Sequence, residues 1–189
     1  MKSKSVEQIP MLSGVFPVRV LVDATKLLRD HEDRIRGYAE AAGSNDICVG
    51  LKPYDGLVLA AALACVIANR NHQSNVASFS ATKFFDMKKN FTEDFVGGFD
   101  GIEDILRADL LIMSELSYVS AVVAVELDAV IYRRFCSGMQ TIVTGYNMPV
   151  ESGFSAETID GFGGYPLLAN RLHETAIVVA PELIDERSR

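Results

Sequence analysis

The chain has 189 residues, of which 49% are hydrophobic and 23% charged, and 18 Lys and Arg residues against 25 Asp and Glu residues give a net charge of −7. This composition is typical of a folded domain and excludes a disordered or collagen-like chain. No apolar run reaches the roughly 18 residues that a membrane span requires, and no charged-then-apolar leader opens the chain, so we expect a cytoplasmic protein. The acidic balance argues against tight, charge-driven binding to DNA.

Apolar strand-like segments alternate with segments of helical periodicity along the chain. The first helix is expected at about 23–42, where an apolar stripe of Leu27, Leu28, Ile35 and Tyr38 indicates packing or an interface. Strands are expected at 46–50, 75–80, 109–113, 140–145 and 176–180. Further helices are expected at 57–69, 82–89, 102–107, 122–135 and 167–173, and loops at 51–56, at 90–101 and around glycines 153, 161, 163 and 164.

Strands that alternate with helices predict right-handed crossovers and a parallel sheet covered on both faces. We therefore expect an α/β fold, a three-layer sandwich around a parallel sheet. Residues 1–14 are expected to be a flexible segment and residues 15–189 one domain. Three cysteines and three histidines lie scattered without metal-like spacing, so we expect no metal site.

The loop after the first expected strand occupies the place where a phosphate-binding loop would lie. A working P-loop reads G-x-x-x-x-G-K-[ST], with glycines that let backbone N–H groups wrap the phosphates, a lysine for the outer phosphates and a hydroxyl for Mg²⁺. Gly50 matches the first glycine, but Asp55, Gly56 and Leu57 stand at the second glycine, the lysine and the hydroxyl positions. The chemistry of three positions is therefore missing.

Asp55 changes the charge of this loop as well as replacing the second glycine. A carboxylate before a helix accepts hydrogen bonds from the free first-turn N–H groups and is favoured by the helix dipole. Asp55 is therefore expected to fill the anion site from within and to repel a phosphate. Lys52 is the one basic residue of the loop, and as a loop lysine it is expected to be solvated. On this segment alone, an ordinary strand-to-helix turn capped by Asp55 is the simpler interpretation.

Four segments in order resemble AAA+ ATPases of the DnaC/IstB helicase-loader type. Segment 107–116, RADLLIMSEL, resembles the strand with the Walker B motif, and segments 127–138 and 140–149 resemble the helix and the sensor-1 strand. Segment 167–172, LLANRL, resembles the segment that carries the arginine finger. The similarity covers about 46–182 and implies a five-stranded AAA+ sheet without a helical lid domain.

The resemblance also shows which catalytic groups have changed. Ser114 stands where the family has the acid that helps hold Mg²⁺, and Glu115 stands where a glutamate polarises the attacking water. In the sensor-1-like segment that begins at Thr144, Tyr146 has the spacing of the sensor asparagine and Asn147 is displaced by one. Without the lysine, the hydroxyl and the magnesium acid, hydrolysis lacks its electrostatic supports, so no cofactor is expected, and ATP with Mg²⁺ is not expected to bind.

Arg171 stands at the arginine-finger position, where the family's arginine acts on a neighbouring subunit's nucleotide. It is interpreted either as such a finger or as a surface arginine on a helix. Arg133 and Arg134, at the end of the expected helix 122–135, suit the helix dipole and need no ligand.

The resemblance leads to three hypotheses for function. The first is a catalytically inactive helicase-loader-like protein that acts by protein–protein contact in DNA replication or transposition. The second is an active but atypical ATPase that uses Lys52 as a displaced phosphate ligand and retains Glu115 and Arg171. The third is an inhibitory module that mimics a loader subunit. The expected partners are the replicative helicase, a helicase loader or a second copy of the chain, with direct DNA binding weak or absent.

Overall fold

One sheet of five parallel strands, in the order β2-β3-β4-β1-β5, forms the centre of the protein. The computed structural model describes residues 12–72, 75–84, 86, 102–116, 119–145 and 166–179. The strands are β1 (Asp46–Gly50), β2 (Val76–Ser80), β3 (Leu110–Ser114), β4 (Gln140–Gly145) and β5 (Ala176–Val179). Because every pairing is parallel, the carboxyl ends of all strands lie at one edge of the sheet.

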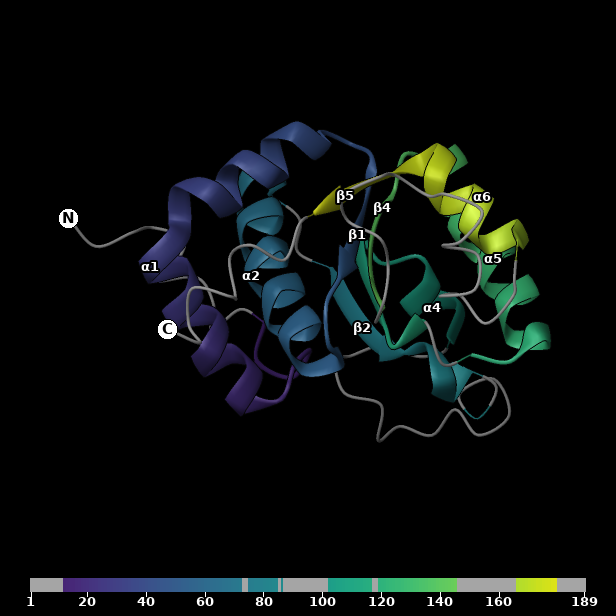
Figure 1. Ribbon diagram of the computed structural model, residues 1–189, viewed down its shortest axis with the longest axis horizontal. Helices are drawn as coiled ribbons and strands as arrows, with labels where there is room; N and C mark the ends of the chain where they lie inside the picture. Colours follow the sequence, from purple (N-terminus) through teal and green to yellow (C-terminus); the bar gives the residue numbers. More distant parts are fainter. Residues whose placement is uncertain are drawn as a thin grey trace.

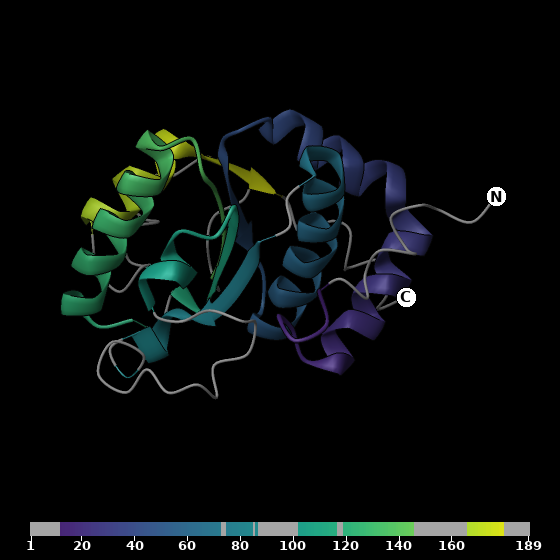
Figure 2. The same ribbon diagram turned by 180° about the vertical axis from the view of Figure 1, so that it is seen from behind.

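Helices cover both faces of this sheet (Figure 1). On one face lies α2 (Pro53–Asn71), with α1 (Val18–Ala42) packed outside it. On the other face lie α4 (Ile102–Leu106), α5 (Ala121–Cys136) and α6 (Pro166–Thr175), as the reverse view shows (Figure 2). The predicted α/β three-layer architecture with a five-stranded parallel sheet is confirmed.

The apolar residues of α1 and α2 are buried because of where the two helices lie in these layers. Every residue of α2 from Val58 to Ala68 is buried, because the sheet covers one side of the helix and α1 covers the other. The α1 stripe of Leu27, Leu28 and Ile35 is fully buried against the same core, and Tyr38 packs beside it. Of the two interpretations of this stripe, packing is therefore confirmed.

Several boundaries differ from the sequence-based expectation. α1 begins at Val18 and not near residue 23, directly after Pro17 (φ −56°). Of residues 18–22 only Val20 and Leu21 face the core, although three of the five are valines. The chain before α1 is also packed, since Leu12 is 1% exposed and Ser13 forms a bridge to Phe16. Residues 12–14 of the predicted flexible segment 1–14 thus adjoin the core, residues 1–11 lie outside the described residues, and the flexibility of the segment stays a prediction.

The remaining expected elements match in part. The short helix expected at 82–89 is described only at its start, where a single 3₁₀ turn, Ala81–Lys83, follows β2. The expected loops at 90–101 and around glycines 153, 161, 163 and 164 lie outside the described residues. Across the described part of the chain, no helix combines the length and apolar character needed to cross a membrane, and no group of His, Cys, Asp and Glu is placed to hold a metal ion.

Candidate functional site at the carboxyl edge of the sheet

A cleft of about 930 Å³ opens where β2 and β3 end. Its walls are the carboxyl ends of these two strands, the chain that leads into α1 and the first turns of α2. Phe16, Tyr54 and Leu57 give it an apolar side, and Ser80, Lys83 and Glu115 give it a polar side. Ligands of open α/β sheets bind at this edge, so the cleft is the candidate functional site.

Glu115 lies at the polar end of the cleft, directly after β3. Its carboxylate Oε2 accepts hydrogen bonds from the hydroxyls of Ser80 and, at 3.4 Å, of Thr82. Its backbone has φ 62°, in the left-handed region that non-glycine residues rarely adopt and that costs about 1 to 3 kcal/mol. The surroundings therefore hold one carboxylate in a defined place at the cleft.

Ser114, one residue earlier, is engaged with the sheet. Its side chain is 7% exposed, and its hydroxyl is 3.4 Å from the backbone carbonyl of Phe79, to which it donates. A neutral hydroxyl bonded in this way is a weak magnesium ligand compared with the carboxylate that the Walker B resemblance implies at this position. Ser114 and Glu115 are thus adjacent at the cleft, and only Glu115 contributes a charge.

The connection from β1 to α2 is much shorter than expected. β1 ends at Gly50 and α2 begins at Pro53, so that Leu51 and Lys52 alone join them. Proline suits the first helical position because its φ is fixed and it lacks the N–H that would be unpaired there. The expected loop at 51–56 is therefore mostly the first turn of a helix.

Asp55 differs from its predicted role for this reason. It lies inside α2 at the third helical position, and the residue at the N-cap is Lys52, which makes no capping hydrogen bond. The Asp55 carboxylate makes no hydrogen bond within the described part of the chain, and Asp55 does not line the cleft. Its carboxylate adds favourable charge to the positive end of the helix, but the expected capping of free N–H groups is not found.

Gly56 has a packing role in the same turn. It is buried, its N–H donates to the carbonyl of Lys52 at 2.8 Å, and a Cβ placed on it would lie 3.3 Å from Cβ of Thr144 on β4. Thr144 is 1% exposed, and its hydroxyl has no partner among the described residues. Gly56, at the P-loop lysine position, therefore allows α2 to approach the sheet closely.

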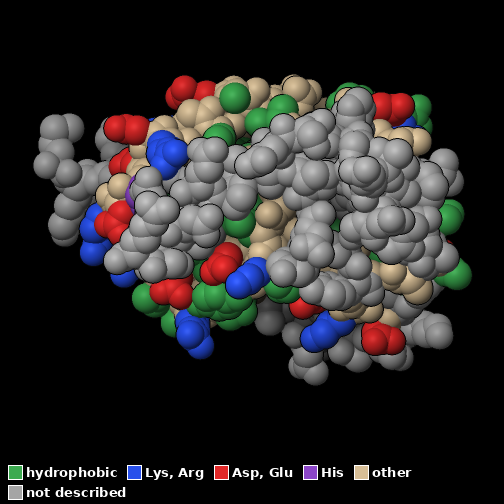
Figure 3. Space-filling model, viewed as in Figure 1, with side chains coloured by type: hydrophobic (Ala, Val, Ile, Leu, Met, Phe, Trp, Pro, Cys, Tyr) green, Lys and Arg blue, Asp and Glu red, His purple; other side chains and the backbone are tan. Residues whose placement is uncertain are grey.

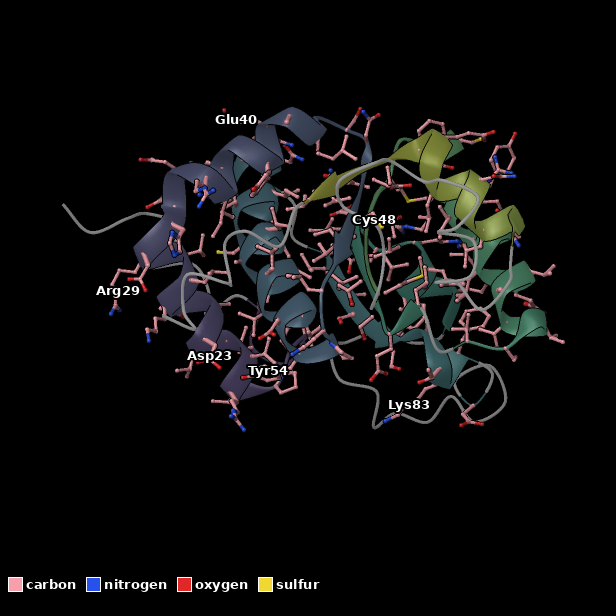
Figure 4. All side chains as sticks on the ribbon, viewed as in Figure 1. Asp23, Arg29, Glu40, Cys48, Tyr54 and Lys83 are labelled. Carbon is pink, nitrogen blue, oxygen red and sulfur yellow. The ribbon has the colours of Figure 1, made fainter. Side chains whose placement is uncertain are left out.

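The lysine at the cleft is Lys83, and Lys52 is exposed away from it. Figure 4 shows Lys83 at the end of the 3₁₀ turn that follows β2.

Tyr54 lies at the wall of the cleft, beside Asp23 (Figure 4). The Tyr54 hydroxyl donates to Oδ2 of Asp23 at 2.6 Å, and the Arg19 guanidinium lies 5.3 Å from the centroid of the Tyr54 ring. The hydrogen bond to Asp23 raises the pKa of Tyr54, because ionisation would place two anions together. These contacts join α1 to α2 at the cleft wall.

Arg171, the candidate arginine finger, is held within its own chain. On α6, its Nε donates to Asp128 of α5 at 3.2 Å and its Nη1 to Glu174 at 3.1 Å. Its guanidinium also stacks 4.2 Å from the ring centroid of Tyr132. These contacts fit the surface-arginine interpretation, and the finger remains a prediction. Tyr146 and Asn147 lie outside the described residues, and the sensor-1 prediction for them stays untested.

A buried polar network, which the sequence analysis missed, lies at the opposite, amino edge of the sheet. Arg134 is 2% exposed and donates to the carbonyls of Leu106 at 2.6 Å, Ala108 at 2.8 Å and Gln140 at 2.7 Å. Burial lowers its pKa to about 10, and Asp46 and Asp109 oppose this change. Arg134 thus ties α5 to β4 and to the chain before β3, a role that its place at a helix end did not reveal.

Asp46, at the start of β1, belongs to the same network. It is fully buried, and its Oδ1 accepts the N–H of Thr141 at 2.7 Å, whereas its Oδ2 has no partner among the described residues. Burial raises the pKa of Asp46 to about 6, and the nearby Thr141, Thr175 and Arg134 offset this only in part. Asp46 was expected as the first residue of the strand 46–50, and no local signal indicated that its carboxylate belongs to a buried polar network.

Charged side chains are interspersed on the face shown in Figure 3. Among the described side chains of that face, Lys and Arg alternate with Asp and Glu and form no broad basic area. Such a surface lacks the clustered positive charge that phosphate backbones attract.

The order of the five parallel strands, β2-β3-β4-β1-β5, agrees with the AAA+-like fold that the sequence resemblance implies. The structure is similar to that of the DnaC helicase loader, with a TM-score of 0.57, 15% identity and coverage of 94% of this chain and 100% of that chain. It is also similar to AMPPCP-bound DnaA from Aquifex aeolicus, with a TM-score of 0.54 and 17% identity over 80% of this chain, although it spans only 46% of that DnaA chain.

A third similar structure is a putative primosome component from Streptococcus pyogenes, with a TM-score of 0.52, 14% identity and coverage of 94% of this chain and 95% of that chain. No protein-family model and no curated protein sequence matches the chain. At identities this low the likeness is one of fold, and the function has to be argued from the site.

Proposed function

We propose that this chain is a catalytically inactive helicase-loader-like protein that acts through protein–protein contacts in DNA replication or transposition. The observation that carries the proposal is the two-residue connection, Leu51 and Lys52, between β1 and α2. A phosphate-binding loop needs several consecutive backbone N–H groups that curve around the anion. Pro53 contributes no N–H, and the N–H of Gly56 is already bonded to Lys52.

Two further observations support the loss of nucleotide chemistry. A lysine side chain at Gly56 would crowd β4, since its Cβ would lie 3.3 Å from Cβ of Thr144, closer than ordinary van der Waals contact. The Ser114 hydroxyl is bonded to the sheet and brings no charge for Mg²⁺. The shared fold with the DnaC helicase loader supports a place among replication proteins and gives the scaffold on which contacts with partners would act.

Calorimetric titration of the protein with ATP and Mg²⁺ tests the proposal. We expect no saturable heat up to about 1 mM ATP, which corresponds to a binding free energy weaker than about −4 kcal/mol. A phosphate-release assay on the same sample is expected to stay at the buffer rate. Micromolar binding accompanied by turnover would overturn the proposal.

One observation favours a second candidate, an active but atypical ATPase. Glu115 is held by Ser80 and Thr82 at the cleft, and Lys83 supplies a cation there, in place of the Lys52 expected from the sequence. On this reading, Glu115→Gln lowers hydrolysis by about 100-fold or more, the usual contribution of a general base. The matched control is Glu103→Gln, an exposed residue that does not line the cleft. Equal activity of the two variants excludes this candidate.

A further inference from the structure

One wall of the cleft is a short segment of chain before α1, the strap, which comprises residues 12–17. Residues 14–17 of the strap line the cleft together with Tyr54 and Leu57 of α2. Figure 2 shows the strap, in purple, beside the first turns of α2. The position of the strap therefore sets the extent of the apolar side of the cleft.

Two side chains hold the strap against the rest of the protein. Leu12 is 1% exposed and Phe16 is 5% exposed, and both belong to the apolar core that α1 and α2 share. Between these two residues, Ser13 and Gly14 are exposed and Val15 is half-buried. The strap is thus anchored by the burial of two apolar side chains.

The backbone of the strap is bonded to itself. The N–H groups of Val15 and Phe16 both donate to the carbonyl of Leu12, at 3.0 and 3.3 Å. Among the described residues, no backbone hydrogen bond joins residues 12–16 to the sheet or to α2. A segment with local hydrogen bonds and few buried contacts opens at a lower free energy than the core of a protein.

Gly14 gives the strap its bend. Its φ of 90° is a conformation that residues with a side chain rarely adopt. The position is exposed and does not belong to the apolar core. Alanine at this position therefore strains the closed strap without changing the core beneath it.

We propose that the strap is a displaceable wall of the cleft and that its closed form is an autoinhibitory contact. Phe16 fills an apolar space that an aromatic ligand takes when the strap opens. The ligand class follows from the side chain that is replaced, because the vacated space holds a phenyl ring and joins a cleft that Tyr54 and Leu57 line. Opening leaves α1, α2 and the sheet folded, so a ligand of the open form gains affinity in proportion to the fraction of open molecules.

Hydrogen exchange of the whole chain, followed by NMR at single amides, tests whether the strap opens by itself. The amides of Val15 and Phe16 are expected to exchange at least about 100-fold faster than those of β4, whose exchange requires wider unfolding. Below the unfolding transition, urea should leave the two strap rates almost constant and should raise the β4 rates, because the slope reflects the surface that opening exposes. Strap rates that follow urea as the β4 rates do would overturn the proposal.

Gly14→Ala is expected to speed up the exchange of Val15 and Phe16 by roughly 5- to 150-fold, the ratio that the usual strain of a non-glycine residue at positive φ corresponds to. Gly37→Ala makes the same replacement at an exposed glycine of α1 that has no positive φ, and is the control. It stabilises α1 equally in the open and closed forms, so the strap rates should equal those of wild type.

Titration with anilinonaphthalene sulfonate, an aromatic probe of apolar surface, tests what the opening does to the cleft. Its binding constant is expected to rise in Gly14→Ala by the same factor as the exchange rates, because open molecules alone accept the ring. The probe is expected to shift the NMR signals of Tyr54 and Leu57, and Gly37→Ala should bind it as wild type does. Unchanged affinity despite faster exchange, or shifted signals only away from the cleft, would contradict the autoinhibitory role. Neither measurement involves ATP, so their outcome is separate from that of the calorimetric titration.

Discussion

At the scale of single residues, Asp46 links the pH of the solution to the stability of the fold. Its folded pKa of about 6 lies above the ordinary value of 3.8, because burial disfavours the carboxylate. A raised pKa means that the folded state holds the proton more tightly than the unfolded state. The contribution of Asp46 to stability is therefore fully present below about pH 3.8 and is lost as pH rises through about 6.

Asp46→Asn is expected to remove this dependence. Between pH 4 and 7 the free energy of unfolding of wild type should fall relative to that of Asp46→Asn by up to about 3 kcal/mol, since one pKa unit corresponds to about 1.4 kcal/mol. Urea unfolding at four pH values measures the difference. Asp30→Asn, at an exposed site on α1, is the control and should follow wild type. Parallel pH profiles for wild type and Asp46→Asn would contradict the assignment.

Arg134 and its neighbour Arg133 illustrate what a sequence does not reveal about single residues. Both are arginines in the last turn of α5, and the helix dipole explains either of them equally well. In the structure Arg133 is exposed, whereas Arg134 is buried and donates to three backbone carbonyls. The difference depends on β4 and on the chain before β3, which local periodicity does not place. Asp46 was missed for the same reason.

At the scale of elements, the strands and the layer order were predictable and the start of α2 was not. Each strand is a short apolar run, and the helices between them repeat at helical spacing, which suffices for a parallel α/β sandwich. Pro53 is as compatible with a loop as with the first position of a helix, and the sequence alone favours the loop. Because the helix starts at Pro53, Asp55 lies inside α2 and not at the expected cap. The predicted filling of the anion site by the Asp55 carboxylate is therefore not found.

Gly56 offers a test of this turn. Alanine in place of an exposed helical glycine stabilises a protein by about 0.5 to 1 kcal/mol, and Gly37 on α1, where an added Cβ would have no atom within 4 Å, should show this gain. At Gly56 the contact with Thr144 at 3.3 Å opposes the gain, so Gly56→Ala should give little or none. Gly56→Leu should lower the free energy of unfolding by about 1 to 3 kcal/mol through overpacking. Urea unfolding of all three variants measures these changes, and a Gly56→Leu variant as stable as wild type would show that the turn has free space.

At the scale of the whole molecule, net charge limits how tightly the protein can bind nucleic acid. A net charge of −7 repels a phosphate backbone, and the described side chains on the face in Figure 3 present no basic area to offset it. A fold like that of a helicase loader does not by itself require the chain to bind DNA. Contacts with other proteins need only local complementarity of charge and shape.

We expect fluorescence anisotropy with labelled single-stranded and duplex DNA of about 30 nucleotides to show dissociation constants weaker than about 10⁻⁴ M at 0.15 M salt. The reason is that 25 Asp and Glu residues outnumber the 18 Lys and Arg residues, and repulsion by these acids opposes the release of counterions that drives such binding. A repeat at about 20 mM salt, where electrostatic attraction is strongest, serves as the control and should give only marginal binding. Micromolar affinity whose logarithm falls linearly with the logarithm of salt concentration would contradict the expectation.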